Sequence, residues 1–341
     1  MRSERYSRQI LFPGISEPGQ EELLKATAVI VGCGALGTVQ AESLVRAGVG
    51  HVRIIDRDFV EESNLQRQTL FDEADARAGL PKAIAAERRL RQINSSVRVE
   101  GIIEDVNPTN ILELIAGARI ILDATDNFET RFLINDASVK TTIPWIYGAC
   151  VGSYGLTMTI VPGETPCLRC LFQSAPPLGA SPTCDTAGVI APIVNMIASL
   201  QVTEALKLLV GKFEKRHGKL INLDVWDWRL TAIDLTMARR LDCATCAHHE
   251  FEYLHGKATG AGMVLCGRNS VQINRAAGQS TDFAQLAERL QSLGEVMYND
   301  FLFKFKTDLY EIAVFADGRG IIKGTKEIGV AKTVFNKYIG G

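Results

Sequence analysis

The chain has 341 residues, which is long enough to bury at least one full core and to form about two domains of ~150 residues each. Its 37 lysine and arginine residues nearly balance its 39 aspartate and glutamate residues and leave a net charge of −2. The overall charge of the protein therefore does not attract nucleic acids or membranes, and any anionic ligand must be bound by local charged or polar groups.

The first residues of the chain lack the apolar core of a signal peptide, and polar residues interrupt the most apolar stretch, at about 188–210. We therefore expect a cytoplasmic protein. Without an export signal, the eight cysteines are expected to be free thiols, and a CxxC pair to be a metal or redox site.

The first half of the chain alternates between strand and helix patterns. A strand at 28–31, a helix at 36–47 and a strand at 52–55 form a predicted βαβ unit. The same alternation continues through the following predicted elements: a helix at 83–93, strands at 97–102 and 120–122, a helix at 129–140 and a strand at 145–147. This pattern predicts an α/β protein whose ligands bind at the carboxyl ends of mainly parallel strands.

From Gly152 onward the pattern changes. Longer β stretches at 156–161 and 219–224 predict an antiparallel extension, and a helix is expected at about 191–209. A loop rich in proline, glycine and serine, at 174–182, is a candidate mobile crossover segment.

A polar stretch at 248–262 is expected to be a linker between two domains. The first domain is predicted to span residues 1–250, and a small α+β unit, called here the C-terminal module, to span 262–341. The elements expected in this module are a helix at 283–293, a hairpin at 301–315, a turn at 317–318 that leads into a strand at 321–322, and a helix at 327–338.

A glycine-rich loop connects the first strand to the first helix. Gly32, Gly34 and Gly37 form a GxGxxG pattern, whose glycines allow a tight turn and let phosphates approach the helix N-terminus. Asp56 ends the second strand about 20 residues later, where it can accept hydrogen bonds from ribose hydroxyls. The loop and the alternation together predict a Rossmann-like, doubly wound, mainly parallel sheet that binds a nucleotide.

Groups beyond the loop favour ATP over NAD. Arg67 and Lys82 follow the second strand and can neutralise phosphate oxygens, while Asp126 ends a later strand and can hold Mg²⁺. A hydride transfer needs none of these groups. Two simpler interpretations stay open: Arg67 and Lys82 are solvated surface charges, and Asp126 with Asn127 caps the following helix.

Two CxxC pairs lie roughly 70 residues apart: Cys167 with Cys170, and Cys243 with Cys246. Each pair presents two sulfurs from one tight turn, so four thiolates can close a tetrahedral Zn²⁺ site. Such a site would clamp two distant segments and would be structural. The alternatives are unrelated reduced cysteines, a redox pair, or a site in which His248 or His249 replaces one ligand.

The four other cysteines have different settings. Cys33 and Cys150 are expected to be buried, and Cys266 begins the C-terminal module. Cys184 follows the Pro/Gly-rich loop beside a predicted helix start, where an accessible thiol could become a thiolate nucleophile. Composition alone favours an inert cysteine at this position.

These features taken together resemble the ThiF/MoeB family, relatives of the ubiquitin-activating enzymes. The resemblance runs in family order over about 245 residues. Its motifs are Arg5-Tyr-Ser-Arg8-Gln-Ile, Gly32 to Gly37, Ser63-Asn-Leu-Gln-Arg-Gln68, Pro81-Lys82, Asp123-Ala-Thr-Asp-Asn127, Cys167 to Cys170, Thr183-Cys-Asp-Thr-Ala-Gly188 and Cys243 to Cys246.

The resemblance implies that ATP adenylates the C-terminal Gly-Gly carboxylate of a small ubiquitin-like sulfur carrier, either ThiS-like for thiamine thiazole synthesis or MoaD-like for molybdopterin synthesis. Residues 1–250 would then be the ATP-binding adenylation domain. The implied ATP and Mg²⁺ residues are Gly32, Gly34, Ala35, Gly37, Asp56, Asp58, Ser63, Asn64, Leu65, Gln66, Arg67, Lys82, Asp126 and Asn127, with the four paired cysteines on Zn²⁺.

Two further roles follow from the resemblance alone. Arg8 resembles an arginine that family members insert into the ATP site of a partner subunit, which implies an active homodimer. Cys184 matches the position where some relatives bind the carrier covalently, and a cysteine desulfurase is an expected sulfur donor. We therefore expect catalytic contributions from Arg8, Arg67, Lys82, Asp126 and Cys184.

This sequence departs from the family pattern in three places. Ala35 stands where many relatives have glycine, the segment 75–80 is slightly long, and the C-terminal module is not part of the minimal family core. The module and Cys184 favour the thiazole branch. The competing hypotheses are an NAD(P)-dependent oxidoreductase with structural zinc and a non-enzymatic scaffold that presents a carrier to other proteins.

Overall fold

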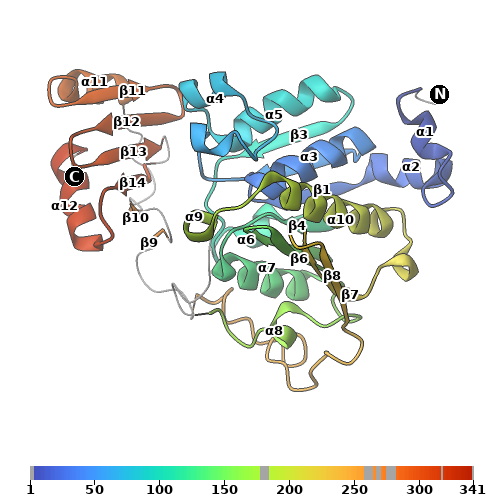
Figure 1. Cartoon of the computed structure of the whole chain (residues 1–341). Coiled ribbons are helices and arrows are strands. Elements are labelled where there is room, and N and C mark those ends of the chain that lie inside the picture. The colour runs from blue at the N-terminus through green and yellow to red at the C-terminus, as the bar shows by residue number, and fades with distance from the viewer. Residues whose placement is uncertain are drawn as a thin grey trace.

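The computed structural model describes residues 4–176, 184–256, 264–265, 270–273, 282–315 and 318–339 (Figure 1). Its strands form an eight-stranded sheet in the first 234 residues and a six-stranded sheet near the C-terminus. Within these described ranges, no helix combines the length and the apolarity needed to cross a bilayer.

The eight-stranded sheet has the order β3-β2-β1-β4-β5-β6-β7-β8. Its first five strands are parallel, and β5 to β8 pair in antiparallel fashion, which confirms the predicted doubly wound sheet and its extension. The bounds are β1 Thr27–Val31, β2 His51–Ile55, β3 Arg98–Ile102, β4 Ile120–Asp123, β5 Trp145–Val151, β6 Tyr154–Ile160, β7 Lys219–Asp224 and β8 Arg229–Asp234.

Helices cover both faces of this sheet, so its parallel strands are apolar on both sides. Alternate residues of β1 show the two layers. Ala28 and Ile30 pack in one core with α3 (Ala35–Ala47), α5 (Lys82–Ile93) and α10 (Ala191–Leu209). Val29 and Val31 pack in the other core with α6 (Ile111–Leu114) and α7 (Phe128–Thr141), which lie below the sheet in Figure 1.

The six-stranded sheet belongs to the C-terminal module and has the order β11-β12-β13-β14-β10-β9, with every pair antiparallel. Its strands are β9 Val264–Leu265, β10 Ser270–Ile273, β11 Glu295–Tyr298, β12 Leu302–Lys306, β13 Glu311–Phe315 and β14 Gly320–Lys323. The helices α11 (Phe283–Leu290) and α12 (Ile328–Tyr338) pack on one face. Figure 1 shows the module beside α4 (Glu73–Ala78).

Two predictions for this part of the chain were wrong. The helix expected at 283–293 ends at Leu290, because only four residues separate it from strand β11. The stretch 248–262 is not simply a linker, since Tyr253 and Leu254 are buried against α7. Residues 257–262 lie outside the described part, as do 177–182 of the Pro/Gly-rich loop, Cys266 and Asp317.

Candidate nucleotide site and metal centre

The glycine-rich loop turns tightly between β1 and α3. Gly32 has φ +96°, and a Cβ atom there would lie 2.6 Å from the carbonyl oxygen of Ala124. A Cβ on Gly37 would lie 2.2 Å from the carbonyl oxygen of Gly32. Both positions therefore require glycine for packing, whether or not a ligand binds.

The space around Gly34 is open instead. A Cβ atom there would meet only the side chain of Gln68, at 3.9 Å, and no side chain caps the N-terminus of α3, which begins at Ala35. The first backbone N–H groups of a helix have no partner within the helix. An anion such as phosphate can accept hydrogen bonds from these N–H groups, and the positive end of the helix dipole also attracts it.

Asp56 closes the loop from the end of β2. Its carboxylate accepts hydrogen bonds from the backbone N–H of Cys33, at 2.5 Å, and of Asp58, at 2.7 Å. Burial raises the pKa of Asp56 and the nearby Lys82 ammonium opposes this rise. Since each carboxylate oxygen can accept a second hydrogen bond, Asp56 retains acceptor capacity for a ribose hydroxyl.

Lys82 is held beside this carboxylate by a short β-bridge between Phe59 and Pro81. Its backbone N–H donates to the carbonyl of Asp58 at 2.9 Å, and its Nζ lies 3.3 Å from the Asp58 carboxylate. The side chain of Lys82 is only 3% exposed. The interpretation of Lys82 as a solvated surface charge is therefore wrong, because burying a lysine requires a charged partner or ligand.

The Ser63-to-Arg67 stretch begins with a 3₁₀ turn, η2 (Glu62–Asn64). Asn64 is buried, and its Oδ1 accepts from the N–H of Glu61 as part of a capping box. Arg67 is half-buried, and its Nη1 donates to the carbonyl of Ser63 at 2.8 Å. Ser63 and Gln66 are exposed, and Leu65 is half-buried. The turn thus ties the Arg67 guanidinium to its own backbone.

Asp126 and Asn127 occupy different positions after β4. Asn127 is the N-cap of α7, since its Oδ1 accepts from the N–H of Thr130 at 2.8 Å, so the capping interpretation is right for this residue. Asp126 is exposed, and the Asn127 amide donates to its Oδ1 at 3.4 Å. The Asp126 carboxylate is available to a cation, whereas Asn127 is occupied by the helix.

Two arginines at this edge of the sheet were not found from the sequence. Arg57 donates a hydrogen bond to Asp105 at 2.7 Å. Burial lowers the pKa of Arg57, but the negative charges of Asp105, Asp58 and Asp126 raise it by more, so the pKa lies above its usual value. Arg131 is buried and forms an ion pair with the buried Asp123 at 3.2 Å. The only sequence signal for Arg57 was its position directly after Asp56, at the end of a strand.

Arg8 lies far from these groups within one chain. It is exposed on α1 (Ser7–Ile10), and the next residue, Gln9, donates to the carbonyl of Ala47 at 2.8 Å. Ala47 ends α3, and a helix of 13 residues is about 20 Å long. Arg8 therefore lies at the edge of the sheet opposite the glycine-rich loop and does not reach the site of its own chain.

Cys184 begins the short helix α9 (Cys184–Ala187), and its side chain lies outside the described part. The residues after α9 return to the main sheet, because the N–H of Gly152 donates to the carbonyl of Gly188 at 2.8 Å. Cys33 is buried as expected. Cys150 is only half-buried, contrary to prediction, because the last three residues of β5 are incompletely covered.

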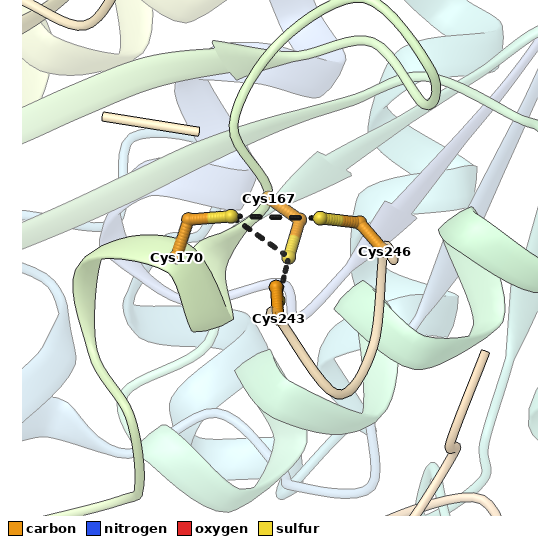
Figure 2. Close-up of side chains that lie close together, drawn as sticks. All are labelled: Cys167, Cys170, Cys243 and Cys246. Atoms are coloured by element: carbon orange, nitrogen blue, oxygen red, sulfur yellow. Dashed lines mark hydrogen bonds between the residues drawn. The ribbon is translucent and has the colours of Figure 1, made fainter. Parts of the chain in front are cut away.

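The four paired cysteines meet in one cluster. Figure 2 shows their side chains pointing toward one another, two from the segment around α8 (Leu168–Leu171) and two from a later loop. Their sulfurs lie within 4.8 Å of one another, with Cys167 3.9 Å from Cys170 and 3.6 Å from Cys243, and Cys170 3.5 Å from Cys246. Tetrahedral zinc with Zn–S bonds of about 2.3 Å needs sulfurs about 3.8 Å apart. The geometry fits zinc.

The chemistry of the cluster also fits a cation. Burial, together with the neighbouring thiols, raises the pKa of Cys246 to about 12, and the hydrogen bond with Cys170, together with burial, also raises the pKa of Cys167. Four thiolates cannot coexist here without a cation to neutralise them. The sulfurs are too far apart for a disulfide, whose S–S bond is about 2.05 Å. His248 and His249 are exposed and do not belong to the group.

Helix α7 holds both CxxC turns through two adjacent side chains. Asn135 accepts from the N–H of Leu168 at 2.8 Å, beside Cys167. Asp136 accepts from the hydroxyl of Thr245 at 3.1 Å and from the N–H of Tyr253 at 2.9 Å. The two turns, 76 residues apart in the sequence, therefore share one rigid support. The same helix begins at the candidate nucleotide site.

Asp136 gives a prediction on pH. Burial raises its pKa from 3.8 to about 6, so the folded state keeps this proton at a pH where the unfolded state has lost it. Stability from this carboxyl is thus full below about pH 4 and is lost as the pH rises through 6. Relative to Asp136→Asn, the free energy of unfolding of the original protein should fall by about 1 kcal/mol between pH 5 and 7.5. Urea unfolding of both proteins measures this difference, and a rise would contradict it.

Comparison with known proteins agrees with this geometry. A family model described as "ThiF family" matches residues 6–261. The chain is 50% identical over 337 residues to a sulfur carrier protein ThiS adenylyltransferase of Bacillus subtilis, covering 98% of this chain and 99% of the relative. It is 39% identical over 248 residues to a sulfur carrier protein adenylyltransferase of Thermus thermophilus, covering 71% and 90%.

Solved structures show the same architecture. A crystal structure of E. coli MccB with ATP has a TM-score of 0.61 and 27% sequence identity, and the match covers 72% of this chain and 75% of that chain. The family match extends over most of the chain and includes the glycine-rich loop, the Asp58–Lys82 pair and all four clustered cysteines. The chain therefore belongs to the ThiF family.

Proposed function

We propose that the protein is an adenylyltransferase that activates a ThiS-like sulfur carrier for the synthesis of the thiazole of thiamine. The observation that carries the proposal is the 50% identity, over 98% of this chain, to the B. subtilis ThiS adenylyltransferase. That similarity continues through the C-terminal module, whereas the match to the Thermus relative covers 71% of the chain. A MoaD-like carrier, activated by the same chemistry, is the alternative.

The reaction joins the C-terminal glycine carboxylate of the carrier to the α-phosphorus of ATP. One carboxylate oxygen forms a bond to this phosphorus, the bond to the bridging oxygen breaks, and pyrophosphate leaves with the bond electrons. A carboxylate is already ionised at neutral pH, so the step needs no general base. Alignment of the reactants and neutralisation of phosphate charge supply the catalysis.

We assign the phosphate groups to the open loop around Gly34, to the N-terminus of α3 and to the cations Arg67 and Lys82. Asp56, at the end of β2, would hold the ribose. The exposed carboxylate of Asp126 would hold Mg²⁺, which neutralises phosphate charge when it is bound. Asn64 and Asn127, whose side-chain oxygens already accept backbone hydrogen bonds, would support the backbone of the site.

The proposal extends to the assembly and to the metal. Arg8 would enter the site of a second copy, because it lies at the opposite edge of its own sheet, and this makes a homodimer the active unit. Zinc on the four cysteines would be structural. Residues 1–250 would form the adenylation domain, with Cys184 near the path of the carrier tail as a candidate covalent site.

A mass measurement tests the function. The purified protein is incubated with ATP, Mg²⁺ and either a ThiS-like or a MoaD-like carrier, and we expect the mass of the ThiS-like carrier to increase by one adenylyl group. An adduct on the MoaD-like carrier alone would assign the alternative pathway. No adduct on either carrier would refute the proposal, and turnover of NAD(P)H would point to the oxidoreductase hypothesis.

A further inference from the structure

The sheet of the C-terminal module packs directly on the segment that carries Asp58. Phe59 is only 5% exposed although it lies in a loop of the adenylation domain. It forms one apolar cluster with four residues from strands β12, β13 and β14: Leu302, Ala313, Phe315 and Ile321. The rings of Phe59 and Phe315 lie 6.4 Å apart between centroids. This contact joins parts of the chain that are more than 240 residues apart.

Two lysines of the module complete the enclosure of the Phe59 ring. The Nζ of Lys304 lies 3.8 Å from the ring centroid, and that of Lys323 lies 5.5 Å from it. Burial lowers the pKa of Lys304, as expected for an ammonium group covered by the interface. Lys323 also forms an ion pair with Glu61. Cation–π contacts strengthen when they are shielded from water, so Phe59 is firmly held.

Two further anchors flank this contact. Asn299 donates to the carbonyl of Ala78 at 2.8 Å, shortly before Lys82 in the sequence. Gln272 donates at 3.1 Å to Asp105, the carboxylate that also binds Arg57. The module therefore contacts three segments near the candidate nucleotide site: the segment after β2, the end of α4 and the segment after β3.

The residues of β12 show that both faces of the module's sheet are covered, one by its own helices and the other by the segment around Phe59. Phe303 and Phe305 pack toward α11 and α12, whereas Leu302 and Lys304 contact Phe59. A strand with both faces covered is held more rigidly than one that faces water. The module is thus a fixed body on the adenylation domain and not a unit tethered at a distance.

The Phe59 contact bears directly on two residues of the candidate site. Phe59 pairs with Pro81 in the β-bridge, its neighbour Asp58 accepts from the N–H of Lys82, and Val60 donates to the carbonyl of Leu80 at 2.8 Å. Any shift of Phe59 moves Asp58 and Lys82 together. If the buried ammonium of Lys82 binds phosphate, its position must be held closely, because a displaced ammonium stabilises the phosphate charge less.

We infer that the C-terminal module is a positioning element of the nucleotide site and that it acts through Phe59, which pairs with Pro81 in the β-bridge beside Asp58 and Lys82. The inference rests on the proposed ATP site. Phe59 is part of the bridge and contacts the module, and it is a positioning residue. The module would affect the binding of ATP and leave the docking of the carrier unchanged.

The experiment measures steady-state KM for ATP and for the ThiS-like carrier in full-length Phe59→Leu, Phe315→Leu and the double variant. Each single substitution removes the aromatic pair while keeping an apolar side chain, and we expect KM for ATP to rise roughly threefold to tenfold. Carrier KM and kcat should change less than twofold. Because Phe315 is inferred to act through Phe59, the double variant should resemble Phe59→Leu.

Phe283→Leu is the matched control, since Phe283 packs on Phe303 at the other face of the same sheet. It should leave KM for ATP unchanged, and thermal melting verifies folding of every variant. An unchanged KM for ATP in Phe315→Leu, or a rise in carrier KM instead, would overturn the inference. Absence of any carrier adduct with the original protein would instead refute the proposed function.

Discussion

Replacing Asp126 with alanine is expected to lower the rate of carrier adenylation by about 10²–10³-fold. Asp126 offers an exposed carboxylate at the end of the central strand β4, beside the glycine-rich loop. Without it, Mg²⁺ would lose its protein ligand, and the phosphate charge would be neutralised less well in the transition state. Because the side chain is exposed and makes one long contact with Asn127, the fold should be unaffected.

The measurement is single-turnover formation of the adenylated carrier, with Mg²⁺ varied. We expect excess Mg²⁺ to restore part of the lost rate in Asp126→Ala, because the metal then binds through the phosphates alone. Asp308→Ala is the control, since Asp308 is an exposed carboxylate of the C-terminal module, between β12 and β13. A full rate in Asp126→Ala at low Mg²⁺ would show that the metal assignment is wrong.

Replacing Cys170 with alanine is expected to abolish zinc binding and to lower the melting temperature by roughly 5–10 °C. The original protein should contain about one zinc per chain. The remaining sulfurs cannot close a tetrahedral site, and the loop that carries Cys243 and Cys246 would lose its attachment to α8. The metal content is measured by elemental analysis and the stability by calorimetry.

Cys150→Ala is the control for this substitution, because Cys150 is a half-buried cysteine outside the cluster. It should keep its zinc and melt close to the original protein. Removal of zinc from the original protein with a chelator should reproduce the loss of stability seen in Cys170→Ala. If Cys170→Ala bound zinc with unchanged stoichiometry and stability, the four-cysteine site would be refuted.

Elements with strong local signals were predicted well. The long helix α10 spans Ala191–Leu209 as expected, because a proline in its first turn marks its start and its residues are mostly apolar along its whole length. The strand β1 and the turn after it were equally clear. Helix α11 was predicted too long, since Gln291 to Leu293 continue a helical pattern that the adjacent strand β11 interrupts.

Pairs of distant residues could not be predicted in the same way. For Lys82 the sequence predicted a phosphate contact but left a solvated surface charge open, and only the folded chain, with its bridge between Phe59 and Pro81, buries the side chain. The residues around Tyr253 looked like a polar linker, yet Asp136 binds their backbone from another helix. The burial of Lys82 and the packing of Tyr253 both depend on which distant segments contact each other, and the periodicity of the sequence does not indicate those contacts.

By itself, the sequence determined the alternating α/β order, the glycine-rich loop and the two CxxC pairs, because each depends on residues close together in the chain. The tertiary structure decided which charged groups are buried, that Arg57 belongs to the edge of the site, and that Arg8 lies at the other edge. It also decided that the C-terminal module rests on Phe59. Burial and electrostatic environment arise only when distant segments pack together, and they are therefore properties of the folded chain.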